Sequence, residues 1–314
     1  MLKYILLLSS TFLLSACIED ITASTPVLTK TFRVVTYNVA NNPDNESEDN
    51  NIKTIFTAIK SINIEDINTK PSIIALQETD STSVIRFVSL INQLYSVQSY
   101  EYIQSTSVGG DRTALIYDTS TFVLESYTEL TNPELTRPVL RGKLKPINGK
   151  EYLYFYVIHL KSGSSSSAED IRKVEAEIIV SDASLLADGN KIFLGDFNLT
   201  GASEGAWLEF MRVAFDPINS IGEWRDSPSF IEIHTQDPGA SMNDRFDFQL
   251  ISATLLDNTG IDYVEGSYTT LGNNGSHVLK STLNTGNGAT PDIMNALMSS
   301  SDHLPVIADY SYTF

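Results

Sequence analysis

Apolar residues along the chain group in two ways, and each grouping predicts a different element. Short runs of β-branched and aromatic residues, bounded by turn-forming residues, are typical of β-strands. Such runs occupy residues 32–37, 73–76, 113–117, 152–159, 192–194, 246–251 and 304–308. No internal repeat separates them, so we expect residues 31–314 to form a single domain.

Between some of these runs, apolar residues recur every three or four positions, which predicts helices with one buried face. Two such helices are expected over residues 51–62 and 81–95. Their apolar faces consist of Ile52, Ile55, Phe56 and Ile59, and of Val84, Val88, Ile91 and Leu94. Because helices do not follow every strand, the pattern favours an α+β (or α/β) fold with mixed sheets covered by helices.

A third helix is expected to begin near Ser167, because residues 167–170 are typical of a capping box. Its apolar stripe would consist of Ile171, Val174, Ile178 and Leu185. Two longer segments, residues 207–234 and 269–290, match no motif. We expect them to border the substrate cleft or to form surface loops.

The first residues are typical of an export signal, with Lys3 followed by an apolar run over residues 4–14. This run is too short to span a bilayer stably. Cys17 is the single cysteine of the chain, whereas exported proteins normally use cysteines in disulfide pairs. Residues 14–17, Leu-Ser-Ala-Cys, resemble the lipobox of bacterial lipoproteins. An ordinary signal with an incidental cysteine is the alternative.

The lipobox resemblance implies a signal peptide over residues 1–16, lipidation of Cys17 and a tether over residues 17–30. Residue 18 is isoleucine rather than aspartate, which in Gram-negative lipoproteins implies sorting to the outer membrane. We therefore expect an exported, lipid-anchored protein that faces the periplasm or the cell exterior, with release to the medium as the alternative. No protein partner is inferred.

The net charge of −18, from 21 basic and 39 acidic residues, repels anionic partners at long range. An anionic substrate would therefore need local attraction. Arg137, Arg141, Lys143 and Lys145 alternate along a segment that reads as one strand, so they are expected to share a face. That face would attract an anion, or it would simply be solvated.

Polar side chains stand where several predicted strands end, and loops at such positions can present them from a rigid scaffold. Asn38 and Glu78 follow the first two apolar runs, and His159 closes an aromatic-rich strand. A single well-placed carboxylate suffices for magnesium, which keeps several waters and phosphate oxygens. Taken alone, each has an ordinary alternative: a turn amide, a helix-capping acid or a structural histidine.

Three further clusters are more specific. Asp196 and Asn198 follow an apolar strand at a spacing that directs both side chains to one side of an extended backbone. Asp247 lies between apolar residues, where an unpaired carboxylate would be costly, so it is expected to have a partner such as histidine. Asp302 and His303 directly precede the last strand.

In this order, the six motifs resemble those of the endonuclease/exonuclease/phosphatase superfamily, over residues 32 to about 310. Its members include pancreatic-type deoxyribonucleases, abasic-site endonucleases, neutral sphingomyelinases and inositol polyphosphate phosphatases. The resemblance implies a four-layer αββα sandwich of two packed mixed β-sheets flanked by helices. The inositol phosphatases carry a tryptophan-containing signature around the position of Asp247 that this chain lacks, and the pancreatic-type enzymes carry a disulfide that one cysteine cannot form.

Carried over to this chain, the resemblance implies that Glu78 and Asn38 hold a divalent cation, with Asp302 as a further ligand. Magnesium is expected, with manganese or calcium as alternatives. Arg137, within Thr-Arg-Pro, resembles a position where an arginine lies near the phosphate.

The same resemblance implies that Asp247 orients His303, which acts on the attacking water. Asp196 and Asn198 would position the water or the phosphate. His159 would donate a hydrogen bond or a proton to a phosphoryl or leaving-group oxygen. Whether His303 or Asp196 takes the proton of the water stays open.

The activity expected is metal-dependent hydrolysis of phosphodiesters by in-line water attack, with DNA or RNA as the leading substrate. A sphingomyelinase-like or small-molecule phosphodiesterase or phosphatase is the first alternative. A non-catalytic surface-binding lipoprotein is the second, and the presence of every expected acid, amide and histidine argues against it.

Overall fold

The computed structural model describes residues 28–314 apart from residues 65–66, 110 and 187–188. The expected signal segment, Cys17 and the tether up to residue 27 lie outside the described residues. The first strand begins at Thr29, within the segment assigned to the tether. Across the described part of the chain, no helix has both the length and the apolar character needed to cross a membrane.

The first sheet has seven strands in the order β12-β14-β1-β4-β6-β5, with β13 paired to β14. Strand β1 (Thr29–Asn38) is parallel to β4 (Pro71–Thr79) and antiparallel to β14 (Val306–Thr313), so the sheet is mixed as expected. The other strands are β5 (Tyr100–Gln104), β6 (Arg112–Asp118), β12 (Ile261–Tyr263) and β13 (Thr269–Thr270).

The second sheet has five strands in the order β11-β10-β9-β8-β7, and it is also mixed, because β10 is parallel to β9 and antiparallel to β11. Its strands are β7 (Phe122–Leu130), β8 (Val139–Pro146), β9 (Leu153–His159), β10 (Asn190–Asp196) and β11 (Asp247–Ile251). A separate short hairpin joins β2 (Asn63–Ile64) to β3 (Ile67–Asn68).

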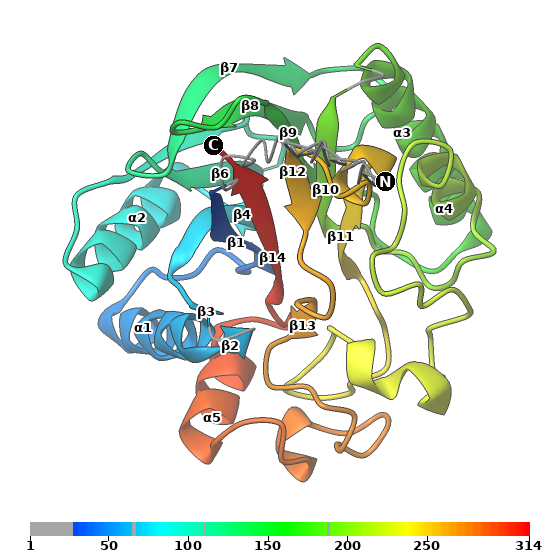
Figure 1. Ribbon diagram of the computed structural model, residues 1–314. Coiled ribbons are helices and arrows are strands. Elements are labelled where there is room, and N and C mark those ends of the chain that lie inside the picture. Colours follow the sequence, from blue (N-terminus) through cyan, green and yellow to red (C-terminus); the bar gives the residue numbers. More distant parts are fainter. Residues whose placement is uncertain (1–27, 65–66, 110, 187–188) are drawn as a thin grey trace, which may run out of the picture.

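Four layers result, because the two sheets pack face to face and each outer face is covered by helices (Figure 1). The core between the sheets joins residues such as Val34 and Ala75 of the first sheet to Val157 and Leu194 of the second. The outer face of the first sheet packs against α1 (Glu46–Ser61), α2 (Ser81–Tyr95) and α5 (Pro291–Ser300), and that of the second against α3 (Ser166–Ser184) and α4 (Gly205–Phe210). The expected αββα sandwich is confirmed.

Helix α2 (Ser81–Tyr95) has the predicted bounds, whereas α1 (Glu46–Ser61) begins five residues before the prediction. Its N-cap is Asn45, whose side chain accepts hydrogen bonds from the N–H groups of Ser47 and Glu48. The polar first turn contains no apolar residue, so periodicity could not reveal it. The remaining helical segments are α4 (Gly205–Phe210), α5 (Pro291–Ser300) and the 3₁₀ turns η1 (Pro228–Ile233), η2 (Ala253–Leu255) and η3 (Leu283–Thr285).

Helix α3 (Ser166–Ser184) exists, but two predictions about it are wrong. Its N-cap is Ser165 rather than Ser167. Its buried face is Ala168, Arg172, Glu175, Ala176, Ile179, Val180 and Ala183, whereas Leu185 of the predicted stripe is 84% exposed. Two charged residues occupy the buried face, and a pattern read from apolar residues alone cannot detect them.

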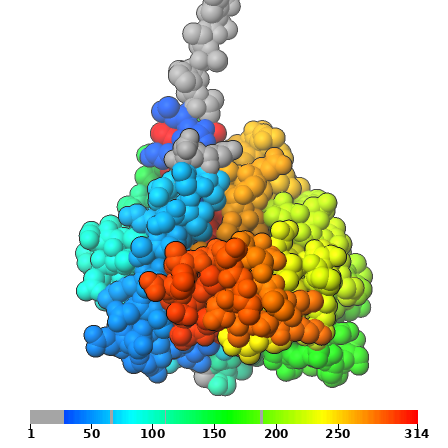
Figure 2. Space-filling model, turned by 90° about the horizontal axis from the view of Figure 1, so that it is seen from below, coloured from blue at the N-terminus to red at the C-terminus, as the bar shows by residue number. Residues whose placement is uncertain are grey.

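The two segments in which the sequence showed no motif, residues 207–234 and 269–290, have different places in the fold. The first buries Trp207 and Trp224 against Phe248, with the two indole rings 4.9 Å apart, so much of it covers the outer face of the second sheet. The second runs into α5, and Figure 2 shows this orange-to-red part of the chain in the middle of one face of the molecule. The side-chain N–H₂ of Asn273 ties the segments together by donating to the carbonyl oxygens of Ile231 and His234.

Candidate active site

The polar ends of six strands meet at one end of the sandwich. Strands β1 and β4 end there in the first sheet, and β9 and β10 end there in the second, because each pair is parallel. Strand β11 begins at the same end, which puts Asp196 in register with His159 on one side and Asp247 on the other. His303 lies three residues before β14. The topology thus brings together residues that the sequence separates widely.

Asn38 links the two sheets at this end. It is fully buried, and its Nδ2 donates hydrogen bonds to Glu78 Oε1 (3.0 Å) and Asp196 Oδ2 (3.2 Å). Its Oδ1 accepts from the N–H of Ala40 (3.1 Å). Glu78 and Asn198 both have left-handed backbones, with φ of 49° and 53°. This conformation is uncommon for Glu, whereas Asn adopts it more readily, and for residues other than glycine it often marks a functional site.

His303 and Asp247 form the paired group that the sequence predicted. Nδ1 of His303 lies 2.8 Å from Asp247 Oδ2, and its Nε2 lies 3.7 Å from Asp196 Oδ2. Burial by itself lowers the pKa of His303, but the charges of Asp247 and Asp196 outweigh burial and raise this pKa to about 10. The imidazole ring is therefore charged at neutral pH in the cation-free protein.

Asp196 lies at the centre of the site. Burial raises its pKa to about 7, although His303 and hydrogen bonds from Asn198 and Asn38 lower it in part. The N–H of Asn198 donates to Asp196 Oδ1 at 2.9 Å. The side chain of Asn198 instead donates to the carbonyl oxygen of Leu160 (3.2 Å), so it holds the end of β9 in place.

His159 is neutral, because burial lowers its pKa well below the usual value. Its Nε2 lies 3.5 Å from Asp196 Oδ2 and 3.8 Å from Glu78 Oε1, whereas its Nδ1 is buried and has no hydrogen-bond partner among the described residues. The single ring proton is therefore more favourable on Nε2, where carboxylate oxygens face it. This tautomer points an N–H donor into the site.

One group of potential cation ligands occurs in the described part of the chain: Glu78, His159 and Asp196, whose ligand atoms all lie within 4.8 Å of one another. The carboxylates, with Asn38 beside them, suit a hard cation such as magnesium. A histidine that ligates a metal usually donates its other ring N–H to an acceptor, and Nδ1 of His159 lacks one. The residues therefore fit a cation held by oxygen atoms, with His159 next to it. Asp302 is exposed and lies outside this group.

Arg137 borders the site, but the other cations of its segment do not. Its Nη1 donates to the carbonyl oxygen of Leu160 (3.3 Å), and its Nε pairs with Asp111 (3.2 Å). Arg137 also precedes β8 rather than lying within it. Arg141 pairs with Asp182 of α3, and both Lys143 and Lys145 lie over the ring of Tyr152. The shared basic face predicted from the alternation is thus used in packing against α3 and tyrosine rings.

Sequence reasoning missed the buried residues that hold the site in place. Thr235, fully buried, accepts hydrogen bonds through Oγ1 from the N–H groups of Phe246 (3.0 Å) and Asp247 (3.2 Å). Its own carbonyl oxygen accepts from the N–H of Leu304 (2.8 Å), next to His303. Thr235 is a lone hydroxyl in an unassigned segment, so no signal in the sequence marks it.

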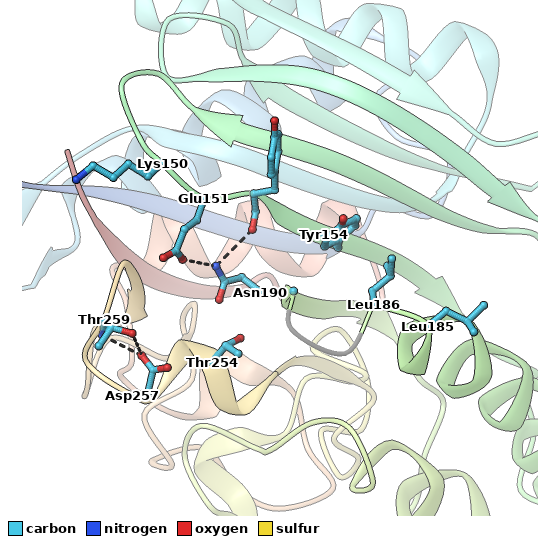
Figure 3. A pocket seen from close by; sticks show the side chains of 11 residues that line it. Lys150, Glu151, Tyr154, Leu185, Leu186, Asn190, Thr254, Asp257 and Thr259 are labelled. Atoms are coloured by element: carbon cyan, nitrogen blue, oxygen red, sulfur yellow. Dashed lines mark hydrogen bonds between the residues drawn. The ribbon is translucent and has the colours of Figure 1, made fainter.

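A cavity of about 660 Å³ lies at the opposite end of the second sheet (Figure 3). Glu151, Tyr154 and Asn190 are among its lining residues, and Asn190 begins the strand that Asp196 ends. They are the first and last residues of β10, six steps apart along the strand, which is about 20 Å. None of the predicted site residues lines this cavity.

Comparisons with known proteins establish the fold. No family model and no curated relative match the chain. Among solved structures, an endonuclease/exonuclease/phosphatase of Bacteroides vulgatus is 14% identical, with 90% of this chain and 98% of that chain covered and a TM-score of 0.58. A mannosyl-6-phosphatase of Bacteroides thetaiotaomicron is 15% identical (89% and 99% covered, TM-score 0.56). TDP2 of D. rerio, complexed with a single-strand DNA product, is 14% identical (89% and 98% covered, TM-score 0.55). The chain therefore has the endonuclease/exonuclease/phosphatase fold.

Proposed function

We propose that this chain is a divalent-metal-dependent phosphodiesterase that hydrolyses DNA or RNA by in-line attack of water. The observation that carries the proposal is the arrangement around Asp196. That carboxylate lies between a neutral histidine donor, His159, and a charged histidine, His303, which Asp247 holds at 2.8 Å. Hydrolysis at phosphorus needs one group that takes a proton from the attacking water and others that stabilise the negative charge on the phosphoryl and leaving-group oxygens.

In this mechanism Asp196 and His303 act as one acid-base pair that holds the attacking water. The Asp196 carboxylate takes the proton of the water, and the charged ring of His303, which Asp247 keeps in position, stabilises that carboxylate. The N–H on Nε2 of His159 donates to a phosphoryl or leaving-group oxygen. A divalent cation held by Glu78 and Asn38 would neutralise the negative charge that develops on the phosphate. Asn38 would turn its amide oxygen toward that cation, because its N–H₂ now points at the two carboxylates.

Nucleic acid is the substrate that we favour, and the TDP2 structure with its single-strand DNA product shows that this fold can bind one. A small-molecule phosphatase is the second candidate, since the mannosyl-6-phosphatase has the same fold at similar likeness. The proposed lipid on Cys17 would anchor the enzyme to a membrane, with the outer membrane as the proposed location.

The test is cleavage of plasmid DNA, RNA, sphingomyelin, mannose 6-phosphate and bis-nitrophenyl phosphate by the purified protein, with magnesium, manganese or calcium and with chelator. We expect magnesium-dependent cleavage of nucleic acid that His303→Ala reduces by about 10²- to 10⁴-fold, since loss of one general acid-base group costs that much. Phosphate release from mannose 6-phosphate alone would favour the second candidate. No hydrolysis of any substrate with any of the metals would refute both.

A further inference from the structure

Lys161 lies two residues beyond His159, directly after the end of β9. The N–H of Leu160 still donates to the carbonyl oxygen of Asp196 (3.0 Å), as in the parallel pairing before it. Along β9, Phe155 and Val157 face the core between the sheets, whereas Ile158 and Leu160 face α3. Continued past the end of β9, this alternation would put the side chain of Lys161 on the same side as that of His159.

Two buried charged residues of α3 hold the backbone of Lys161. Glu175 Oε2 accepts from its N–H (2.8 Å), and Arg172 Nη1 donates to its carbonyl oxygen (3.0 Å). Arg172 and Glu175 are 0% and 1% exposed. Buried charges are costly unless fully paired, so two of them on one peptide unit set its position tightly.

The same two residues hold the other loops that border the site. Glu175 Oε1 accepts from the N–H of Thr136 (2.9 Å), next to Arg137. Arg172 also pairs with Glu204 (2.7 Å), in the loop that follows Asn198. The charged face of α3 therefore positions Lys161 relative to Arg137 and Asn198.

The ammonium group of Lys161, in contrast to its backbone, has no hydrogen bond or ion pair with any described residue, and its side chain is half-buried. The cations around it are paired: Arg137 with Asp111 and Arg172 with Glu204. An unpaired cation with a fixed backbone, in a protein of net charge −18, is suited to bind an anion.

We propose that Lys161 binds the backbone phosphate next to the scissile phosphate of a polynucleotide. Lys161 is two residues from His159, so their Cα atoms are at most about 7 Å apart, and the long lysine side chain can reach a charge beyond the phosphate that His159 faces. A substrate with one phosphate has no group at this place. The inference rests on the proposed nuclease function and specifies its substrate as a chain of phosphates.

The experiment compares Lys161→Ala, Lys161→Arg and a matched control, Lys150→Ala, which removes an exposed lysine at the opposite end of the second sheet. Binding of a labelled single-stranded oligonucleotide is measured by fluorescence anisotropy, in chelator, over a range of salt concentrations. Values of kcat/KM are measured for the same oligonucleotide and for bis-nitrophenyl phosphate. Thermal unfolding confirms that each variant is folded.

We expect Lys161→Ala to weaken oligonucleotide binding about five- to tenfold and to reduce the slope of log K against log salt by about 0.7, the value for one contact to a single strand. Its kcat/KM should fall several-fold more for the oligonucleotide than for bis-nitrophenyl phosphate. Lys161→Arg should retain most of the binding, and Lys150→Ala should match the wild type.

A Lys161→Ala protein that binds and cleaves as Lys150→Ala does would overturn the role of Lys161 and leave the nuclease proposal standing. Equal losses on both substrates would also overturn it, because the lysine would then act at the scissile phosphate or through the fold. A wild-type protein that neither binds nor cleaves the oligonucleotide would refute both proposals.

Discussion

Replacement of Thr235 by valine tests whether a single buried hydroxyl holds the Asp247–His303 pair in place. Thr235 is fully buried, and its Oγ1 accepts from the N–H groups of Phe246 and Asp247. Valine has nearly the same shape but offers no acceptor. Two buried N–H groups would lose their partner, and the backbone that carries Asp247 would be free to shift.

The expected cost follows from these contacts. Each buried N–H group left without a partner costs about 1–3 kcal/mol, so Thr235→Val should lower the free energy of unfolding by about 2–6 kcal/mol. That is a large part of a typical total of about 5–15 kcal/mol. A displacement of the Asp247 carboxylate by about 1 Å from His303 would reduce activity by about 10²-fold.

Urea unfolding followed by circular dichroism, and hydrolysis of bis-nitrophenyl phosphate at a temperature where the variant is folded, measure the two effects. Thr235→Ser keeps the oxygen and should retain most of the activity. Thr113→Val is the matched control, because Thr113 is also buried but its Oγ1 has no hydrogen-bond partner in the described part of the chain. A Thr235→Val protein that loses less than about 1 kcal/mol and keeps its activity would refute the reasoning.

Two further predictions concern the cation and pH. Glu78→Gln keeps an acceptor for Asn38 but removes the charge nearest the proposed cation, so calorimetry should show at least about tenfold weaker magnesium binding; unchanged affinity would argue against a cation at Glu78. Burial lowers the pKa of His234 in the folded protein. In the unfolded chain this histidine has its usual pKa of about 6.5, so below that pH the unfolded chain binds more protons at His234 than the folded protein does. Stability should therefore fall as pH drops below about 6.5, by up to about 1.4 kcal/mol per pH unit for this residue. His234→Gln should flatten that fall in urea unfolding between pH 7.5 and 5, and an identical pH slope would contradict the assignment.

The sequence by itself indicated strands β1, β4, β6, β9, β10, β11 and β14 and the helices α1 and α2, but not β5, β7, β12 and β13. Strands buried on both faces read as continuous apolar runs, and each of these helices carries a stripe that repeats every three or four residues. It also identified the polar strand ends, including Asn38, Glu78, Asp196 and His303, because each follows or precedes such a run. These signals are local, since every one of them lies within a few residues of the element that it marks.

Only the tertiary structure decided which of these residues meet. Asp247 and His303 are 56 residues apart, and Asn38 and Asp196 are 158 apart, so their contacts depend on strand order and register. Arg172 lies on a helix face that looks exposed in sequence, and it pairs with Glu204, which is 32 residues further along the chain. A charge can be buried only where a distant partner compensates it. The local sequence does not contain that partner. The buried residues that position the site could therefore be identified only from the tertiary structure.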